Sequence, residues 1–254
     1  MKICVLASGS RGNAAWIRSG KTAVLVDAGI SFRALKERLA ELDEDLGLLK
    51  GVIITHEHSD HIAGLPILQK KTGAPVFATP GTASAIADRQ GLNGIHRFSA
   101  GETFGLGSLE ILGFPVSHDA EEPVGVVVSA RGGLRLGLVT DLGVATRLVE
   151  QRLKPCQVVI VEANHDPRML IEGKYEWSLK QRIQSRYGHL ANEKAGELLT
   201  KIHHADLAHV FLAHRSKDNN TPQLQLAAAE EAIGGRGTAI HLTWQEKPAE
   251  AVEI

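Results

Sequence analysis

The stretch that decides the fold is Val52-Ile53-Ile54-Thr55-His56-Glu57-His58-Ser59-Asp60-His61. Its first three residues are apolar and β-branched, which predicts a buried strand. If the strand continues into the polar part, His56 and His58 point the same way, because side chains alternate along a strand. Asp60 and His61 then fall where the chain bends into a helix. Two imidazoles on one side and a carboxylate with an imidazole on the other predict a metal site.

A different zinc-binding motif, found in helical zinc proteases, also begins with His-Glu and must be excluded for this stretch. The pattern H-E-x-x-H places two histidines four residues apart on a helix, whereas the fourth residue after His56 is Asp60. The residues that precede His56 are also strand-like rather than helical. The other alternative is a polar loop in which histidines cluster without function. Four ligand-type side chains directly after a buried strand favour metal binding over that reading.

Size and composition are those of an ordinary globular chain. Its 254 residues can bury one large core, and we expect a single domain over 1–254. A net charge of −1 gives no overall footprint for nonspecific nucleic-acid binding, although it is compatible with a local basic patch. The two cysteines are far apart and lack metal-binding spacing, which predicts reduced thiols. With no transmembrane-length run or signal-peptide pattern, we expect a cytoplasmic protein without membrane contact.

The rest of the chain alternates strand and helix patterns up to about residue 90 and is strand-rich from 95 to 138. Ser31 is expected to cap a helix, and Thr221 with Pro222 predicts another helix start. A helix is also expected from Asn192, with that residue as its cap. The tail 247–254 is expected to be frayed.

Further ligand-type side chains follow other predicted strands. They are Asp27 after 22–26, His118 after 114–117, Asp141 after 136–140 and His214 after 207–213. Taken singly, each has a simpler explanation. An aspartate at a strand end often caps the next helix, and a histidine there is more often an ordinary surface residue.

The order of these motifs resembles that of the metallo-β-lactamase superfamily, whose H-x-H-x-D-H signature matches residues 56–61. The resemblance implies an α/β fold, the four-layer αβ/βα sandwich, with two divalent metal ions at one edge of its two sheets. The implied ligands are His56, His58 and His118 for one metal, Asp60, His61 and His214 for the other, and Asp141 between them. Asp27 would orient the ligands from behind. Zinc is the expected metal, and manganese or iron also suits such ligands.

Two further motifs resemble those of tRNase Z-like phosphodiesterases. They are Val161-Glu162-Ala163 and Tyr187-Gly188-His189-Leu190-Ala191. The resemblance implies that Glu162 and His189 form a catalytic pair beside the metals, with Asp60 contributing to catalysis as well as to metal binding. Phosphodiester cleavage expels an alkoxide, so a protonated imidazole held by a carboxylate is a sensible general acid.

Most of residues 1–225 looks like the YycJ-type branch of exonuclease-like hydrolases. The segments that carry this likeness are 6–13, 162–166, 188–193 and 214–220. The resemblance implies DNA as the nucleic-acid substrate and 5′ to 3′ exonuclease activity. The expected substrate contacts are Ser8, Ser10 and Asn13 in the first loop, and Ser216, Asn219 and Asn220 in the last. The first loop also reads as a simple hairpin turn that needs glycine and asparagine.

Metal ligands alone do not choose the reaction, so other functions stay open. The interval between His118 and Asp141 is too short for a tRNA-gripping arm, and no β-CASP domain or glyoxalase-type helical domain fits. A small-molecule or cyclic-nucleotide phosphodiesterase is the main alternative. A glyoxalase- or lactamase-type hydrolase is less favoured, and so is a metal-stabilised binding module without activity. The sequence carries no information on oligomeric state.

Overall fold

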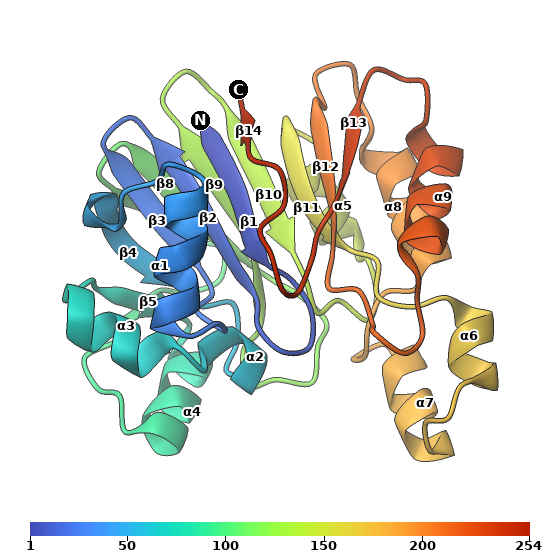
Figure 1. Cartoon of the computed structure of the whole chain (residues 1–254), viewed down its shortest axis with the longest axis horizontal. Coiled ribbons are helices and arrows are strands. Elements are labelled where there is room, and N and C mark those ends of the chain that lie inside the picture. Colours follow the sequence, from blue (N-terminus) through green and yellow to red (C-terminus); the bar gives the residue numbers. More distant parts are fainter. The chain divides into compact units, whose positions relative to one another are not determined.

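The computed structural model describes all residues from 1 to 254 (Figure 1). The chain divides into two compact units. The first unit contains residues 1–115, 120–134 and 244–254, and the second contains 116–119 and 135–243. Neither unit is one continuous piece of sequence. The expectation of a single domain over 1–254 stays a prediction.

The first unit is built on a sheet with the strand order β14-β1-β2-β3-β4-β5-β6. Its strands are β1 (Lys2–Ala7), β2 (Ala14–Ser19), β3 (Thr22–Val26), β4 (Leu49–Ile53), β5 (Val76–Ala78), β6 (His96–Arg97) and β14 (Val252–Glu253). Neighbours from β14 to β3 are antiparallel, and those from β3 to β6 are parallel. An antiparallel set of β7 (Thr103–Leu106), β8 (Leu109–Pro115) and β9 (Val124–Ala130) completes the strands of this unit.

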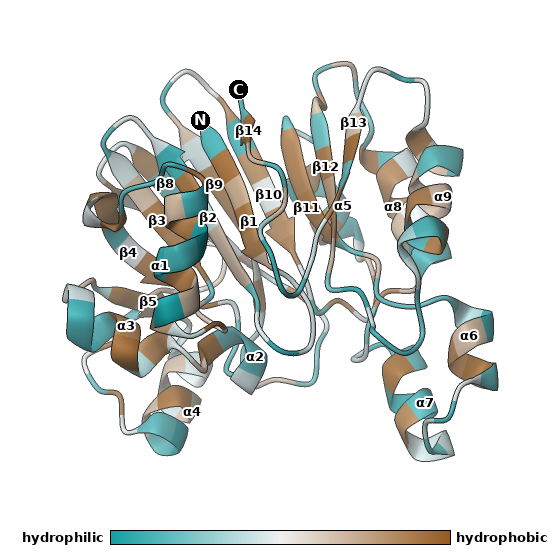
Figure 2. Cartoon of the chain, in the orientation of Figure 1, coloured by the Kyte–Doolittle hydropathy of each residue, from teal (hydrophilic) through white to brown (hydrophobic).

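Helices of the first unit are α1 (Phe32–Glu41), α2 (Ser59–Ile62), α3 (Leu65–Thr72) and α4 (Pro80–Gln90), with a 3₁₀ turn at Leu46–Leu48. The predicted cap of α1 is confirmed, because the Ser31 hydroxyl accepts a hydrogen bond from the Ala34 N–H. Leu35 and Leu39 of α1 are buried in the same apolar cluster as Trp16. Hydrophobic residues therefore fill the strands, while the helices carry hydrophilic residues on their outer faces (Figure 2).

The second unit is built on four parallel strands, β10 (Arg135–Val139), β11 (Val158–Glu162), β12 (His209–Ala213) and β13 (Ala239–Leu242). Every residue of β11 is buried, as expected for a strand covered on both faces. The helices are α5 (Arg147–Leu153), α6 (Pro167–Glu172), α7 (Trp177–Gln184), α8 (Asn192–Ile202) and α9 (Pro222–Ile233). Because parallel strands end at the same edge, the residues after β10, β11 and β12 are brought together.

Two expectations about chain ends and caps are wrong. The C-terminal tail is not frayed, because Val252 and Glu253 pair with Ile3 and Lys2 and extend the sheet edge. Helix α8 begins at Asn192, but its N-cap is Ala191, and the Asn192 amide is used elsewhere. By contrast, the predicted cap at Thr221 is confirmed by its hydrogen bond from the Leu224 N–H. None of the helices combines the length and hydrophobicity that a membrane span requires.

A glycine after β3 allows three loops of the first unit to approach closely. The Asn13 N–H donates to the Asp60 carbonyl at 2.7 Å, and the Gly29 N–H donates to the Asn13 carbonyl at 2.9 Å. A Cβ atom on Gly29 would lie 1.7 Å from the Asp60 carbonyl oxygen. No side chain fits there, so the position of Asp60 depends on Gly29.

We expect Gly29→Ala to lower the free energy of unfolding by about 2 kcal/mol or more, because the loop that carries Asp60 must move. Urea unfolding measures this change. Gly105→Ala is the matched control, since a Cβ at Gly105 meets nothing within 4 Å. That substitution should stay within about 0.5 kcal/mol of the unsubstituted protein. Equal stability of the two variants would contradict the proposed close approach.

Candidate metal centre

Residues 54–61 follow β4 and include the first three residues of α2. We call this segment the metal-binding loop, after the metal site that the sequence predicts. Strand β4 ends at Ile53, so the expectation that strand geometry aligns His56 with His58 is wrong. The loop itself brings them together, with ring centroids 4.7 Å apart and planes nearly perpendicular. His61, the third residue of α2, lies with its ring centroid 4.0 Å from that of His56. The loop therefore gathers the imidazoles without a strand.

The buried carboxylate of Asp27 fixes the metal-binding loop from behind. Its Oδ1 accepts the Thr55 N–H at 2.8 Å, and its Oδ2 accepts the Nδ1–H of His61 at 2.8 Å. With Nδ1 donating to the carboxylate, the lone pair of His61 is on Nε2. Metal-binding histidines in proteins commonly have such a carboxylate on the opposite nitrogen. This contact is the geometry expected of an orienting residue.

Asn13 was expected to contact substrate, but the structure engages it with the predicted ligands instead. Its Nδ2 donates to Asp60 Oδ2 at 3.1 Å and to His61 Nε2 at 3.0 Å. Its Oδ1 accepts the Gly9 N–H at 2.9 Å. Asn13 therefore positions Asp60 and His61. Of its neighbours, Ser8 is buried and Ser10 is exposed, and substrate contact at these two stays a prediction.

Glu162, at the end of β11, holds the predicted site residues His189 and His214 of the second unit in place. It is fully buried, and its Oε1 lies 2.8 Å from His189 Nδ1 and 3.0 Å from His214 Nδ1. Its Oε2 accepts the N–H groups of Leu142 at 2.7 Å and Leu190 at 3.0 Å. One carboxylate thus holds two imidazoles, the backbone that follows β10 and the backbone that precedes α8. The predicted pair of Glu162 with His189 is present, and its additional hold on His214 was not foreseen.

Asp141, His118 and His214 lie close together in the same unit. His214 Nε2 is 3.5 Å and His118 Nε2 is 3.8 Å from Asp141 Oδ1. The His118 Nδ1–H donates to the Gly188 carbonyl at 3.2 Å, which leaves Nε2 as the nitrogen with a lone pair. His61, His118 and His214 therefore share one tautomer, with the hydrogen on Nδ1 and the lone pair on Nε2.

Nitrogen and oxygen donors in this arrangement fit a divalent metal. One donor atom each from Asp141, Glu162, His189 and His214 lies within 4.8 Å of the others. Imidazole and carboxylate ligands suit zinc, manganese or iron. Because the Glu162 oxygens already accept hydrogen bonds, Asp141 and His214 are the better candidate ligands in this group, and their metal binding stays a prediction.

Three predicted site residues adopt a backbone conformation that is rare outside glycine. Only four non-glycine residues in the chain have positive φ, and they include Asp27 at 61°, Asp141 at 56° and His214 at 53°. Each lies one or two residues after a strand. Strained backbone of this kind concentrates at functional sites, where the surrounding structure over-determines it.

The loop after β12 contains residues that were expected to bind substrate. The side chain of Asn220 is engaged within the fold, because its Nδ2 donates to the carbonyls of Ala163 and Asn164 and its Oδ1 accepts from Asn192. Substrate contact at Asn220 stays a prediction. Ser216 is nearly buried, and its hydroxyl accepts the Asn219 N–H.

Asn219 differs from its neighbour, because neither side-chain atom has a hydrogen-bond partner although the residue is buried. Substrate contacts of Ser216 and Asn219 stay predictions. Sequence reasoning missed Asn164, whose Nδ2 donates to the His214 carbonyl at 2.7 Å. Its only signal was its place two residues after Glu162.

The electrostatics of the Glu162 pair favour a charged carboxylate and a protonated imidazole. Burial alone would raise the pKa of Glu162, but His189 and His214 outweigh it and hold the pKa at about 2. Burial likewise opposes the charged form of His189, yet the Glu162 carboxylate raises its pKa above the ordinary value. By contrast, burial lowers the pKa of His118, which therefore stays neutral as a metal ligand must.

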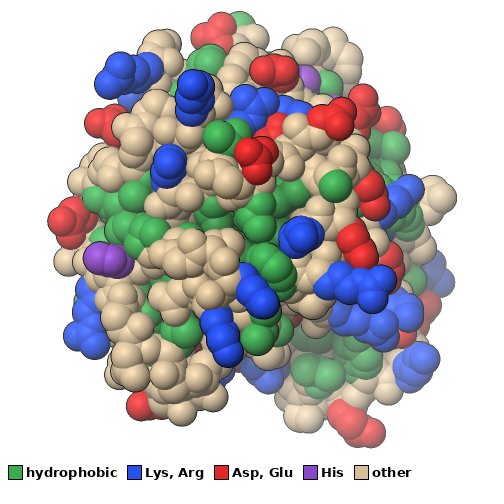
Figure 3. Space-filling view, turned by 60° about the vertical axis from the view of Figure 1, so that its left-hand side comes forward, with side chains coloured by type: hydrophobic (Ala, Val, Ile, Leu, Met, Phe, Trp, Pro, Cys, Tyr) green, Lys and Arg blue, Asp and Glu red, His purple; other side chains and the backbone are tan.

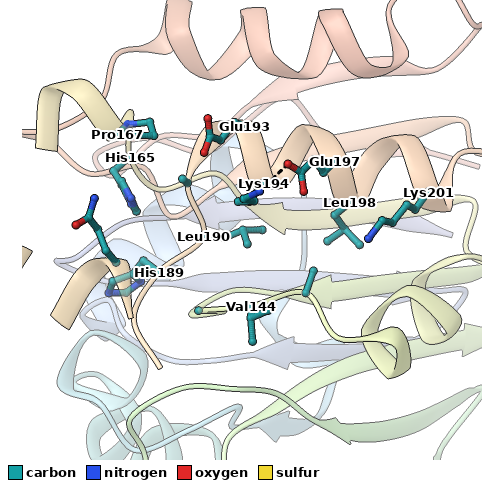
Figure 4. Close-up of a pocket in the computed structure, with 14 residues that line it drawn as sticks. Val144, His165, Pro167, His189, Leu190, Glu193, Lys194, Glu197, Leu198 and Lys201 are labelled. Carbon is teal, nitrogen blue, oxygen red and sulfur yellow. Dashed lines mark hydrogen bonds and ion pairs between the residues drawn. The ribbon is translucent and has the colours of Figure 1, made fainter. Parts of the chain in front are cut away.

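A cavity of about 470 Å³ lies in the second unit, with His189 in its wall. Figure 4 shows His189 and His165 at one end and Lys201 towards the other. Val144, Leu190 and Leu198 form apolar walls, while Lys194 is paired with Glu197 at 2.7 Å. His165 is a second residue that the sequence did not reveal. It is buried, its Nδ1 has no hydrogen-bond partner, and burial lowers its pKa to about 4.

Comparison with known proteins identifies the family. A family model described as a beta-lactamase superfamily domain matches residues 22–214. The chain belongs to the metallo-β-lactamase superfamily. The exodeoxyribonuclease YycJ of Bacillus anthracis is 34% identical over 239 residues, covering 93% of this chain and 90% of that protein. The exodeoxyribonuclease WalJ of Streptococcus pneumoniae is 35% identical over 245 residues, covering 92% and 91%.

Solved structures support the fold. The metallo-β-lactamase fold protein YhfI of Bacillus subtilis aligns with a TM-score of 0.75 and 15% identity, covering 100% of this chain and 98% of that one. The predicted fold is confirmed, because the chain forms two mixed sheets flanked by helices, the α/β sandwich of this superfamily.

We expect Asp27→Asn to weaken zinc binding by about 10- to 100-fold, because an amide cannot accept hydrogen bonds at both positions that Asp27 serves. Competition with a chromophoric chelator measures the affinity. Asp43→Asn is the matched control, since Asp43 also has positive φ, at 54°, but is exposed and distant in sequence from the metal-binding loop. Unchanged affinity in Asp27→Asn would remove the carboxylate from the orienting role.

Proposed function

We propose that this protein is a dinuclear metal-dependent phosphodiesterase that degrades DNA in the 5′ to 3′ direction. The observation that carries the proposal is the contact of His189 with the buried Glu162 at 2.8 Å, next to Asp141 and His214. Thioester cleavage expels a thiolate that can leave without a proton, whereas phosphodiester cleavage expels an alkoxide that must be protonated. The two exodeoxyribonuclease relatives support the same reaction class.

In this proposal the chain holds a pair of cations. The proposed ligands are His56, His58 and His118 for one cation, Asp60, His61 and His214 for the other, and Asp141 between them. When bound, two such cations polarise the phosphate and lower the pKa of an attacking water. Zinc is the first choice, with manganese and iron as alternatives. The support is family membership together with the shared tautomer of His61, His118 and His214.

The residues of the chain then divide the remaining work. His189 delivers a proton to the leaving oxygen, and Glu162 holds its Nδ1 so that Nε2 is the nitrogen available to substrate. Asp27 and Asn13 keep His61 and Asp60 in place. The apolar wall formed by Val144 and Leu190 beside His189 gives a nucleotide a surface to contact while water is excluded.

Location in a reducing, cytoplasmic compartment is also part of the proposal. Cys4 and Cys156 are both free and buried, and burial raises the pKa of each thiol to about 12. Thiols of that kind are unreactive and need no oxidising environment.

The test of the proposal joins metal analysis with a substrate panel. Purified protein should contain two zinc, manganese or iron ions per chain, and removal of the metal by a chelator should abolish hydrolysis. The panel contains end-labelled single- and double-stranded DNA, RNA and cyclic nucleotides. Release of mononucleotides from the 5′ end of DNA is the expected result. Hydrolysis of cyclic nucleotides with intact DNA would move the assignment to the small-molecule alternative.

The catalytic role of His189 gives a separate prediction. His189→Ala should reduce turnover of a DNA linkage by about 10²- to 10⁴-fold, because its alkoxide leaving group needs a proton. A p-nitrophenyl diester, whose leaving group needs none, should lose far less. His96→Ala, at an exposed histidine of β6, is the control for both substrates. Metal content measured on each variant should be unchanged, and equal losses on both substrates would exclude the general-acid role.

A further inference from the structure

Residues 167–187 of the second unit form a segment that we call the arm. It contains α6, the connection 173–176, α7 and the turn that leads to Gly188. Figure 1 shows α6 and α7 beyond the ends of α8 and α9 rather than against the sheet. The ammonium group of Lys180 is buried inside the arm and donates to the Ile171 carbonyl at 2.8 Å. The arm is therefore an ordered element.

The arm carries most of the large hydrophobic side chains that the chain exposes. Seven such side chains are exposed in the whole protein, and four belong to the arm. They are Ile171, Trp177, Leu179 and Tyr187, with Trp177 60% and Tyr187 51% exposed. Hydrophobic residues on both short helices are visible in Figure 2. A concentration of this kind marks a contact surface, whereas scattered single residues do not.

The arm carries a positive net charge, although the whole chain does not. It contains five Lys and Arg residues against two Glu, which gives net +3, while the whole chain carries −1. Over the face drawn in Figure 3, by comparison, side chains of both signs are interspersed. Arg186 lies over the ring of Tyr187, with its guanidinium carbon 5.4 Å from the ring centroid. Arg168 pairs only with Glu172 on the same exposed helix, and Lys174 reaches Asp218 only at 3.9 Å.

Weak exposed ion pairs of this kind contribute little to stability and give way easily to a phosphate. Arg168, Lys174 and Arg186 are therefore available to a polyanion, whereas Lys180 and Arg182 are engaged within the fold. Contact between the arms of two copies would instead bring like charges together, because a twofold interface repeats the same surface.

The C-terminal end of the arm is fastened to the site residues. The His189 N–H donates to the Ile183 carbonyl at 2.9 Å, and the Asp119 N–H donates to the Tyr187 carbonyl at 3.2 Å. Arg182 Nε donates to Asp119 Oδ2 at 2.6 Å. Asp119 follows His118 directly, so the arm ends beside two proposed site residues. A ligand bound at this end of the arm would therefore lie near His189.

We propose that the arm binds single-stranded DNA, with bases stacked on Trp177 and Tyr187 and phosphates held by Arg168, Lys174 and Arg186. This rests on the proposed function and adds a surface that holds the substrate strand. Stacking on exposed aromatic rings is tolerant of sequence, because every base presents a π-face. Arginine and lysine beside the rings supply the salt-dependent part of the affinity.

Binding is measured by fluorescence anisotropy of a labelled single-stranded oligonucleotide with phosphorothioate linkages, using the metal-loaded protein. Trp177→Ala and Tyr187→Ala should each raise Kd by about 5- to 100-fold, and Trp177→Phe should restore most of the affinity. Lys174→Ala should reduce the slope of log K against log salt concentration by about 1, the change expected for the loss of one phosphate contact. The controls are Ile67→Ala and Leu224→Ala, which remove exposed hydrophobic side chains outside the arm.

The possible results test DNA binding by the arm separately from the proposed nuclease function. For the arm variants, kcat/KM on single-stranded DNA should fall relative to kcat/KM on bis(p-nitrophenyl) phosphate. If the unsubstituted protein degrades DNA and the arm variants bind it equally well, the arm proposal is overturned and the nuclease stands. If the unsubstituted protein neither binds nor degrades DNA, the proposed substrate itself fails. If Trp177→Ala changes only the mass seen by light scattering, the arm is an interface between copies and the proposal is wrong.

Discussion

The constraint on which the site depends is the grip of buried carboxylates on imidazole nitrogens. Asp27 holds Nδ1 of His61, and Glu162 holds Nδ1 of both His189 and His214. Each contact fixes a ring plane and a tautomer, and so decides which nitrogen faces a cation or a substrate. The same two carboxylates also accept backbone N–H groups from neighbouring loops. Loop geometry and ligand geometry are therefore set by the same interactions.

Holding these groups has a cost in stability that the rest of the fold offsets. Glu162 is fully buried, and Asp27, Asp141 and His214 have left-handed backbone conformations. Each feature is unfavourable by itself, since buried charge must be desolvated and non-glycine residues avoid positive φ. Parallel strands with almost no exposed surface, such as β11, supply the rigid frame that imposes them. The packing of these strands therefore offsets the unfavourable free energy of holding the site residues in fixed positions.

Much of the site was readable from the sequence because its motifs are local. The metal-binding loop and the strand-end positions of Asp141 and His214 come from patterns of a few residues, whereas the pair of Glu162 with His189 was implied by the resemblance to tRNase Z-like phosphodiesterases. The substrate contacts were less readable. Asn13 and Asn220 lie in suitable loops, yet their amides are consumed by hydrogen bonds to groups distant in the chain. Pattern alone does not tell a polar side chain that serves the fold from one that serves a ligand.

The sequence by itself determined the family, the predicted ligands and most elements, because hydrophobic periodicity and motif spacing are properties of short segments. Only the tertiary structure decided which groups touch. It showed that His56 and His58 meet through a loop after β4 has ended, and that Glu162 also serves His214. It also showed that the tail forms β14, and that exposed aromatic and basic residues gather on the arm. These features depend on contacts between residues far apart in sequence, and no local pattern encodes such contacts.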